Sequence, residues 1–184
     1  MSATDRYILL FVISTLLVVC GCEKAGVADD DGPAPSDVTL VVADTVVRHS
    51  GERYGSAASP YTVGDLAVGS LGLYVRSTGV ELDGKWVVGY VVGYVQGTNF
   101  SNVVFDAGGV ESNIVLADDP DEDDPERTVP VQLATASSYV EVRQALNLCY
   151  NPWVLGRRVA VKGRICSYMS TIGMKNTIDY IYED

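Results

Sequence analysis

The chain has 184 residues, 47% of them hydrophobic, and a formal net charge of −11 with a single histidine. This length suits one domain with an additional segment. The acidic balance disfavours binding of nucleic acid or an anionic lipid surface through bulk charge. His49, the one imidazole, lies in a polar loop where we expect it to be solvated, so the sequence gives little support to catalysis by a histidine base.

The first element in the chain is an apolar block of 14 residues, Tyr7–Cys20. A spanning helix needs about 20 apolar residues, so the block is closer in length to the apolar core of a secretory signal. An uncleaved membrane anchor at the same place is the alternative. The nearby Cys20 and Cys22 allow three interpretations: a metal pair, a redox pair or a processing signal. A zinc site needs about four ligands, and the other two cysteines lie far downstream.

The four residues Val19-Cys20-Gly21-Cys22 resemble the bacterial lipobox, which ends in a lipidated cysteine. Cys22 is the matching position, because lipidation of Cys20 would need the β-branched Val19 where a small residue is required. Arg6 is offset by Asp5, so the segment lacks the usual positive start. We therefore predict that residues 1–21 are a lipoprotein signal peptide. The protein is then exported and anchored in the envelope membrane, expected to be the outer membrane, through a lipid on Cys22.

Residues 22–37 follow, rich in Gly, Pro, Ala and Asp, and predict a disordered tether. We assign residues 38–184 to one domain with an N-terminal extension. Val38–Val47 is β-rich and predicts a first strand. After a polar loop, Thr62-Val63-Gly64-Asp65 has the spacing of a capping box that opens a short helix.

The run WVVGYVVGYV, Trp86–Val95, predicts a long strand. Its alternation places one set of side chains on one face: Trp86, Val88, Tyr90, Val92 and Tyr94. Gly89 and Gly93 share the other face. Glycines spaced along one side let a strand bend and coil, so one strand can serve both sheets of a small barrel.

Four further strands and one helix complete the pattern. The strands are Asn113–Ala117, Val129–Leu133, Arg157–Ser170 and Ile178–Tyr182, and the helix is Val140–Leu148, between the third and fourth barrel strands. The helix is indicated by Val142, Ala145 and Leu146 at helical spacing. This order predicts a mainly β fold, an OB-like five-stranded barrel with a helix between strands three and four.

Several segments match the pattern of one domain family. They are Ser59–Val63, Gly89–Tyr94, Ser112–Asp118, Pro130–Leu133, Ala145–Leu148, Asn151–Pro152, Leu155–Val159 and Gly173–Thr177. Through them the chain resembles, over about residues 59 to 180, an OB-like family of unknown function found in secreted and lipid-anchored proteins of Bacteroidetes. The resemblance implies a fold and an envelope setting and supplies no catalytic residue. The chain departs from the pattern at Cys149, at Cys166 and in the insert Gly64–Asp83.

Charge is unevenly distributed along the domain. Residues 118–126 hold seven acidic groups, whereas residues 142–178 hold basic groups. Within the first segment two prolines interrupt the acids and no glycine is present, unlike an EF-hand loop. A solvated connection is therefore favoured over a calcium site, and we expect no metal and no cofactor. The basic segment has two interpretations: it complements the acidic loop within the molecule, or it binds a ligand.

Taken together, these features predict a lipid-anchored binding or assembly module without catalytic activity, whose partner is a glycan or an envelope protein. The alternative is a nucleic-acid-binding OB module. Its candidate ligand-binding residues are Trp86, Tyr90, Tyr94, Arg157, Arg158 and Lys162. Core and surface packing is the other explanation of those aromatic residues. Cys149 and Cys166 are either a disulfide, favoured by export, or two separate buried thiols.

Overall fold

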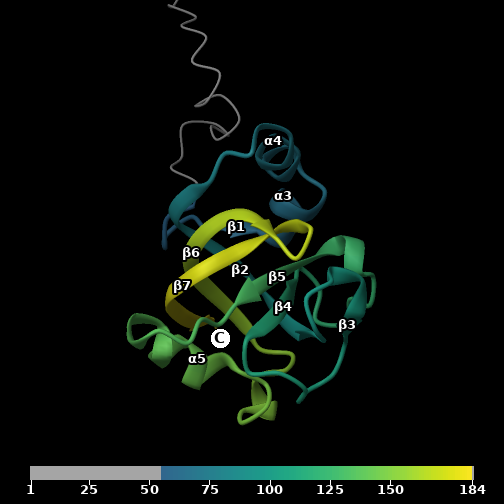
Figure 1. Cartoon of the computed structure of the whole chain (residues 1–184), viewed down its shortest axis with the longest axis vertical. Helices are drawn as coiled ribbons and strands as arrows, with labels where there is room; N and C mark the ends of the chain where they lie inside the picture. Colours follow the sequence, from purple (N-terminus) through teal and green to yellow (C-terminus); the bar gives the residue numbers. More distant parts are fainter. Residues whose placement is uncertain (1–54, 184) are drawn as a thin grey trace, which may run out of the picture. The chain divides into compact units, whose positions relative to one another are not determined.

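The computed structural model describes residues 55–183. The predicted signal peptide, Cys22, the tether, the strand Val38–Val47 and His49 lie outside these residues. The described part is mainly β (Figure 1). No helix within it combines the length and apolar character needed to cross a membrane.

Five strands close into a ring. In chain order they are β2 (Leu82–Val95), β4 (Asn113–Ala117), β5 (Thr128–Gln132), β6 (Arg158–Tyr168) and β7 (Thr171–Glu183). Neighbours around the ring run β2-β4-β5-β7-β6, and a β2–β6 pairing closes it. The β5–β7 pair is parallel and the other ring pairs are antiparallel. Two short strands, β1 (Tyr61–Thr62) and β3 (Val103–Val104), pair with β2 outside the ring.

The long strand β2 belongs to both sides of the ring, as its length and glycines predict. Its first half pairs with β6 and its second half with β4, and Tyr90 pairs with both. At Gly89 an added Cβ would lie 2.7 Å from the Ala117 carbonyl oxygen and from Val63 Cγ2. Glycine therefore permits close packing of α3 (Val63–Ala67) and β4 against this point of β2.

The predicted alternation along β2 is wrong at Tyr94. The register with β4 shifts between Val91 and Gly93, and such a bulge moves the following side chains to the other face. Tyr94 consequently joins the main core with Val87 and Val91. Trp86 and Val88 instead form a separate small cluster with Ala160.

The capping box is confirmed at the start of α3. Thr62 Oγ1 accepts a hydrogen bond from the Asp65 amide (3.2 Å), and Asp65 Oδ2 accepts one from the Thr62 amide (2.9 Å). A second helix, α4 (Ser70–Thr78), follows in the segment where only an insert is expected, and ends at Gly79, whose φ is 69°. The predicted helix after β5 is α5 (Val140–Leu146), which stops two residues early because Asn147 adopts an extended backbone.

The closing strand is longer than predicted. We expected Ile178–Tyr182, but β7 begins at Thr171. The turn between β6 and β7 lies at Met169 and Ser170, whose φ angles are 53° and 66°. The predicted strand Arg157–Ser170 therefore runs two residues too far into a turn that has no glycine to mark it.

The core fills the ring and extends under the helices. Its fully buried members include Val91, Leu116, Val131, Val161 and Met174 from the five strands. Leu66 and Leu71 add the α3–α4 pair at one end, and Leu146 adds α5 at the other end (Figure 1). The two ends are thus closed by different helices.

Candidate functional site

A cavity of about 910 Å³ lies between the α3–α4 pair and two loops of the ring. We call it the helix-side groove. Its lining residues are Ala67, Val68, Leu73, Arg76, Phe100, Ser101, Asp124, Pro125, Glu126, Thr128 and Thr171. They come from the two helices, the β2–β4 and β4–β5 connections, and the starts of β5 and β7. The wall is therefore part apolar and part charged.

The loop that carries Phe100 is held by local hydrogen bonds. Asn99 Oδ1 accepts from the Ser101 amide (3.1 Å), which starts a short 3-10 turn. The Gln96 amide donates to the Asn102 carbonyl (3.0 Å) and closes the loop. Phe100 packs at the edge of an apolar cluster outside β2 and β4, and a second aromatic ring, Phe105, packs there too. This cluster covers the outer face of β4, and Phe100, which belongs to its edge, also lines the helix-side groove.

The acidic wall is similarly fixed. Asp124 Oδ1 accepts from the Glu126 amide (2.9 Å), and the Thr128 hydroxyl donates to the Pro125 carbonyl (2.9 Å). On the helical wall, Arg76 donates to the Ala67 carbonyl (3.1 Å). The groove therefore has one guanidinium facing a wall with two carboxylates, and polar groups of both hydrogen-bonding kinds.

The acidic loop is tied to α3 through its first residue. Asp118 Oδ1 accepts from the Val63 amide (2.9 Å), and Oδ2 accepts from the Gly64 amide (2.7 Å). These are amides of the first helical turn, where a negative charge is favourable. Asp118 is thus a structural residue, whereas Asp119, Asp121, Asp123 and Asp124 are exposed, as a solvated connection predicts.

In the part of the chain from Gly55 to Glu183, no group of three or more His, Cys, Asp or Glu side chains converges to hold a metal ion.

The sequence-predicted ligand residues lie mostly on the outer face of β2 and β6, away from the groove. Trp86 is opposite Lys162, whose ammonium is 5.9 Å from the indole centroid, and Tyr90 is opposite Arg158 at the same distance. Trp86 and Tyr94 are only 7% and 9% exposed, so their rings pack within the protein. Arg157 is exposed in the turn before β6.

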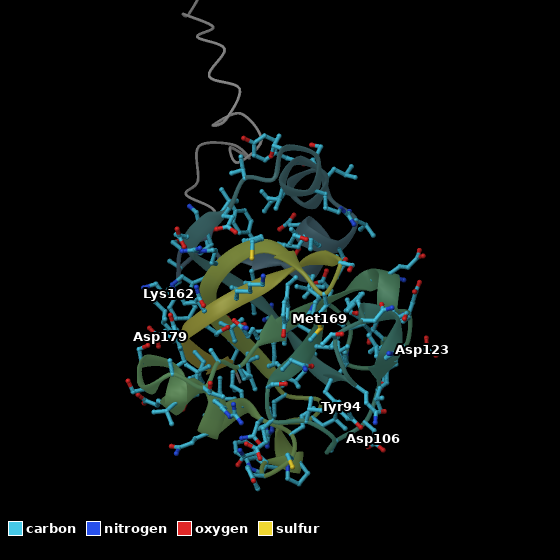
Figure 2. All side chains as sticks on the ribbon, viewed as in Figure 1. Tyr94, Asp106, Asp123, Lys162, Met169 and Asp179 are labelled. Atoms are coloured by element: carbon cyan, nitrogen blue, oxygen red, sulfur yellow. The ribbon has the colours of Figure 1, made fainter. Side chains whose placement is uncertain are left out.

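Three arginines of the basic segment form ion pairs with acids outside the 118–126 loop. Arg143 pairs with Glu111 (2.6 Å) and Arg158 with Glu183 (2.7 Å). Arg164 contacts Glu81 (2.8 Å) and Asp83 (2.5 Å). Lys162 lies beside Asp179 on the neighbouring strand, on the opposite side of the view from Asp123 (Figure 2). These three arginines thus have partners other than the acidic loop.

The Glu111 carboxylate links the β2–β4 connection to the region after α5. Besides the Arg143 ion pair it accepts a hydrogen bond from the Tyr150 hydroxyl (2.7 Å). The hydrogen bond from Arg143, followed by the one from Tyr150, holds the pKa of Glu111 below its usual value. The same contact with Glu111 raises the pKa of Tyr150.

The predicted disulfide is absent from the structure, which has Cys149 and Cys166 as free thiols. Cys149 is exposed after α5, whereas Cys166 is buried inside β6 opposite Gly173. Burial raises the pKa of Cys166, which disfavours its reactive thiolate form.

Sequence reasoning missed the groove residues. Phe100 is a single aromatic residue in the polar stretch Gly97–Asn102, and that isolation is the one signal that marks it. Leu73 and Val68 are exposed apolar residues, at 59% and 65%, yet nothing in their spacing separates them from buried helical positions.

Comparison with known proteins gives one relative and one family. Endonuclease YhcR from Bacillus subtilis (strain 168) is 33% identical over 97 residues, which cover 49% of this chain and 7% of that protein. The chain thus spans a small part of that relative's length. No solved structure matches it significantly. The model of the family described as "Domain of unknown function (DUF6359)" matches residues 75–183, more than half of the chain. The protein therefore belongs to this family of unknown function.

Proposed function

We propose that the ring is an OB-type barrel and that the protein is a non-catalytic ligand-binding module, exported and held at the cell envelope, in the outer membrane, by a lipid on Cys22. The strand order supports this: the ring runs β2-β4-β5-β7-β6 with a parallel β5–β7 pair. A helix, α5, lies between the third and fourth ring strands. This is the arrangement of a five-stranded OB barrel. We also propose that this domain family occurs in envelope proteins of Bacteroidetes.

The observation that carries the function is the position of the helix-side groove. OB barrels bind ligands with strands two and three and with the loops that join strands one to two and four to five. Here Phe100 and Ser101 come from the first of those loops, Thr171 is the first residue of β7 after the second loop, and Thr128 begins the third ring strand. This position supports the proposal that the groove receives a ligand, because it matches the region that OB barrels use for binding.

The charges of the groove favour an uncharged ligand, and we propose a neutral glycan, with a segment of a protein partner as the other form of the same hypothesis. The carboxylates accept hydrogen bonds from sugar hydroxyls, and Arg76 donates hydrogen bonds to the oxygen atoms of such hydroxyls. Phe100 and Leu73 supply apolar contact. A phosphate backbone would meet Asp124 and Glu126, and screening over about 8 Å reduces this repulsion without reversing its sign.

The absence of catalysis is also a proposal. Among residues 55–183, no histidine, cysteine or lysine lines the groove, and nucleophilic catalysis needs a nucleophile within reach of a base. The Asp124 carboxylate already accepts a backbone hydrogen bond. These residues suit recognition better than bond cleavage.

The test is a calorimetric titration of the mature protein with neutral hexasaccharides and with single-stranded oligonucleotides, each at low and moderate salt. Phe100→Ala and Arg76→Ala should each weaken glycan binding about tenfold or more, the loss expected for a buried contact. The control is Gln144→Ala, an exposed residue of α5, which should bind as the wild type does. Glycan binding that is unchanged by both groove variants would reject this assignment.

A second candidate is a module that binds single-stranded nucleic acid. The similarity to a protein named an endonuclease favours it, because a short shared segment suits an accessory binding domain. Its proposed contacts are Tyr90, Arg157, Arg158 and Lys162, the members of the predicted set that retain exposed surface. Oligonucleotide binding that weakens steeply with salt and is lost on changing Arg157, Arg158 and Lys162 to Ala would favour this function over the first.

A further inference from the structure

An exposed tryptophan lies at the turn between α5 and β6, outside the helix-side groove. Trp153 is 56% exposed, although Val154 beside it is fully buried and anchors the turn. Pro152 opens the turn and restricts its backbone. A large apolar ring held in solvent on a rigid turn offers a flat contact surface.

The indole is supported from one side by a second ring. The Trp153 and Tyr182 centroids are 5.5 Å apart, with an interplanar angle of 38°. Tyr182 is itself fixed, since its hydroxyl donates to the Ala145 carbonyl (3.1 Å) and its ring meets Tyr180 edge-on at 5.5 Å. The orientation of Trp153 is therefore set by α5 and β7 together, which lowers the conformational entropy lost on binding.

The polar groups around this ring are of both hydrogen-bonding kinds. The Arg157 backbone is fixed by bonds to Val154 and Val91, and among residues 55–183 its side chain has no hydrogen bond or ion pair. Burial raises the pKa of Tyr182, and the charge of Arg157, which follows the Trp153 turn in the chain, opposes that rise. Arg157 is therefore an available donor.

Acceptors lie on the other side of the same turn. A smaller cavity of about 360 Å³ is lined by Leu155 and Gly156 together with Asp121, Glu122 and Asp123. Asp121, Glu122 and Asp123 share this cavity with Gly156, which precedes Arg157 in the chain, and their charges would repel a phosphate group there, whereas carboxylates accept hydrogen bonds from hydroxyls. A neutral ligand with an apolar face and many hydroxyls fits this combination better than an anion.

We propose that Trp153, supported by Tyr182 and flanked by Arg157, is a second glycan subsite that stacks one pyranose ring of a neutral oligosaccharide. The weakly polar C–H face of a pyranose complements the electron-rich face of an indole. Arg157 donates to ring hydroxyls. The subsite rests on the proposed glycan-binding function, and it adds a contact separate from the helix-side groove. The acidic loop lines the helix-side groove through Asp124 and the smaller cavity beside Gly156 through Asp121.

Tryptophan emission tests the subsite, because the chain has two tryptophans and Trp86 is 7% exposed. The mature wild-type protein is titrated with cellohexaose, xylohexaose and mannohexaose, and with a dT12 oligonucleotide as the anionic probe. One neutral hexasaccharide should shift or quench the emission. Trp153→Ala should abolish that change and weaken binding about tenfold, while Trp153→Phe should retain part of the affinity. The groove variant Phe100→Ala should keep the emission change.

Three results would overturn the subsite. A hexasaccharide that binds with no emission change and with equal affinity in Trp153→Ala rejects it while leaving the groove intact. Emission that responds to dT12 and to none of the sugars assigns the ring to nucleobases. If neither the wild-type protein nor any variant binds a sugar, the subsite is rejected together with the proposed function.

Discussion

Replacement of Asp118 tests how the acidic loop supports the site. Its carboxylate accepts the amides of Val63 and Gly64 at 2.9 and 2.7 Å, so Asp118→Ala leaves two amides of α3 without this partner. Charged side-chain contacts of this kind at a helix start contribute about 0.5–2 kcal/mol, and hydrogen bonds to charged groups about 1.5–3. Because Asp118 is exposed, we take a value in the lower half of the second range and expect a loss of about 2 kcal/mol.

Thermal unfolding followed by circular dichroism measures this loss. At roughly 4 °C per kcal/mol for a domain of this size, Asp118→Ala should lower the Tm by about 8 °C. Asp118→Asn keeps one acceptor oxygen and should lower it by about half as much. The matched control is Asp123→Ala, which removes one charge from the same loop at an exposed position and should leave the Tm unchanged or slightly raised. Equal Tm values for Asp118→Ala and Asp123→Ala would refute the argument.

Three further predictions follow from the other contacts and from the N-terminal segment. Glu111→Gln should lower the free energy of unfolding at pH 7 but not near pH 2. The folded state, chiefly through Arg143, depresses the pKa of this carboxylate, so the carboxylate stabilises the fold above its unfolded pKa and loses that effect as pH falls through the folded pKa. Urea unfolding at both pH values measures the two losses, and equal losses would contradict the prediction. Alkylation without reductant should label Cys149 in the folded protein and Cys166 only after unfolding; resistance of both thiols would indicate a bridge. Mass spectrometry of the mature N-terminal peptide should find Cys22 acylated, and Cys22→Ala should leave the precursor unprocessed; an unmodified Cys22 would reject the anchor.

The spacing of apolar residues along the sequence predicts an element well when one composition or periodicity holds over its whole length. Asn113–Ala117 has its predicted bounds because it lies between turn residues and is buried throughout. The capping box at Thr62 and Asp65 is likewise a local contact. The closing strand was found only in part, since Thr171–Thr177 mixes Gly, Lys and Asn with buried residues and shows no clear alternation.

The side on which Tyr94 lies could not be read from the sequence. A bulge depends on the partner strand, here at the shift between Val91 and Gly93, and it reverses every later side chain. Trp86 and Tyr94 therefore looked like two members of one exposed stacking row, yet both rings are buried in different clusters. Prediction of the candidate site failed for the same reason, because tertiary pairing decides which aromatic rings reach solvent.

The site itself is a product of the connections between elements. The helix-side groove needs α4, the turn with Phe100 and the turn at Asp124 to meet, and no two of these are neighbours in the sequence. What the sequence does predict is the sign of the charge at this place, since the acidic residues must lie in the connection after Asn113–Ala117. That connection supplies carboxylates to the groove and to the cavity beside Gly156. A ligand that spans both must therefore tolerate carboxylates at two points, which favours a neutral glycan over a polyanion at either site.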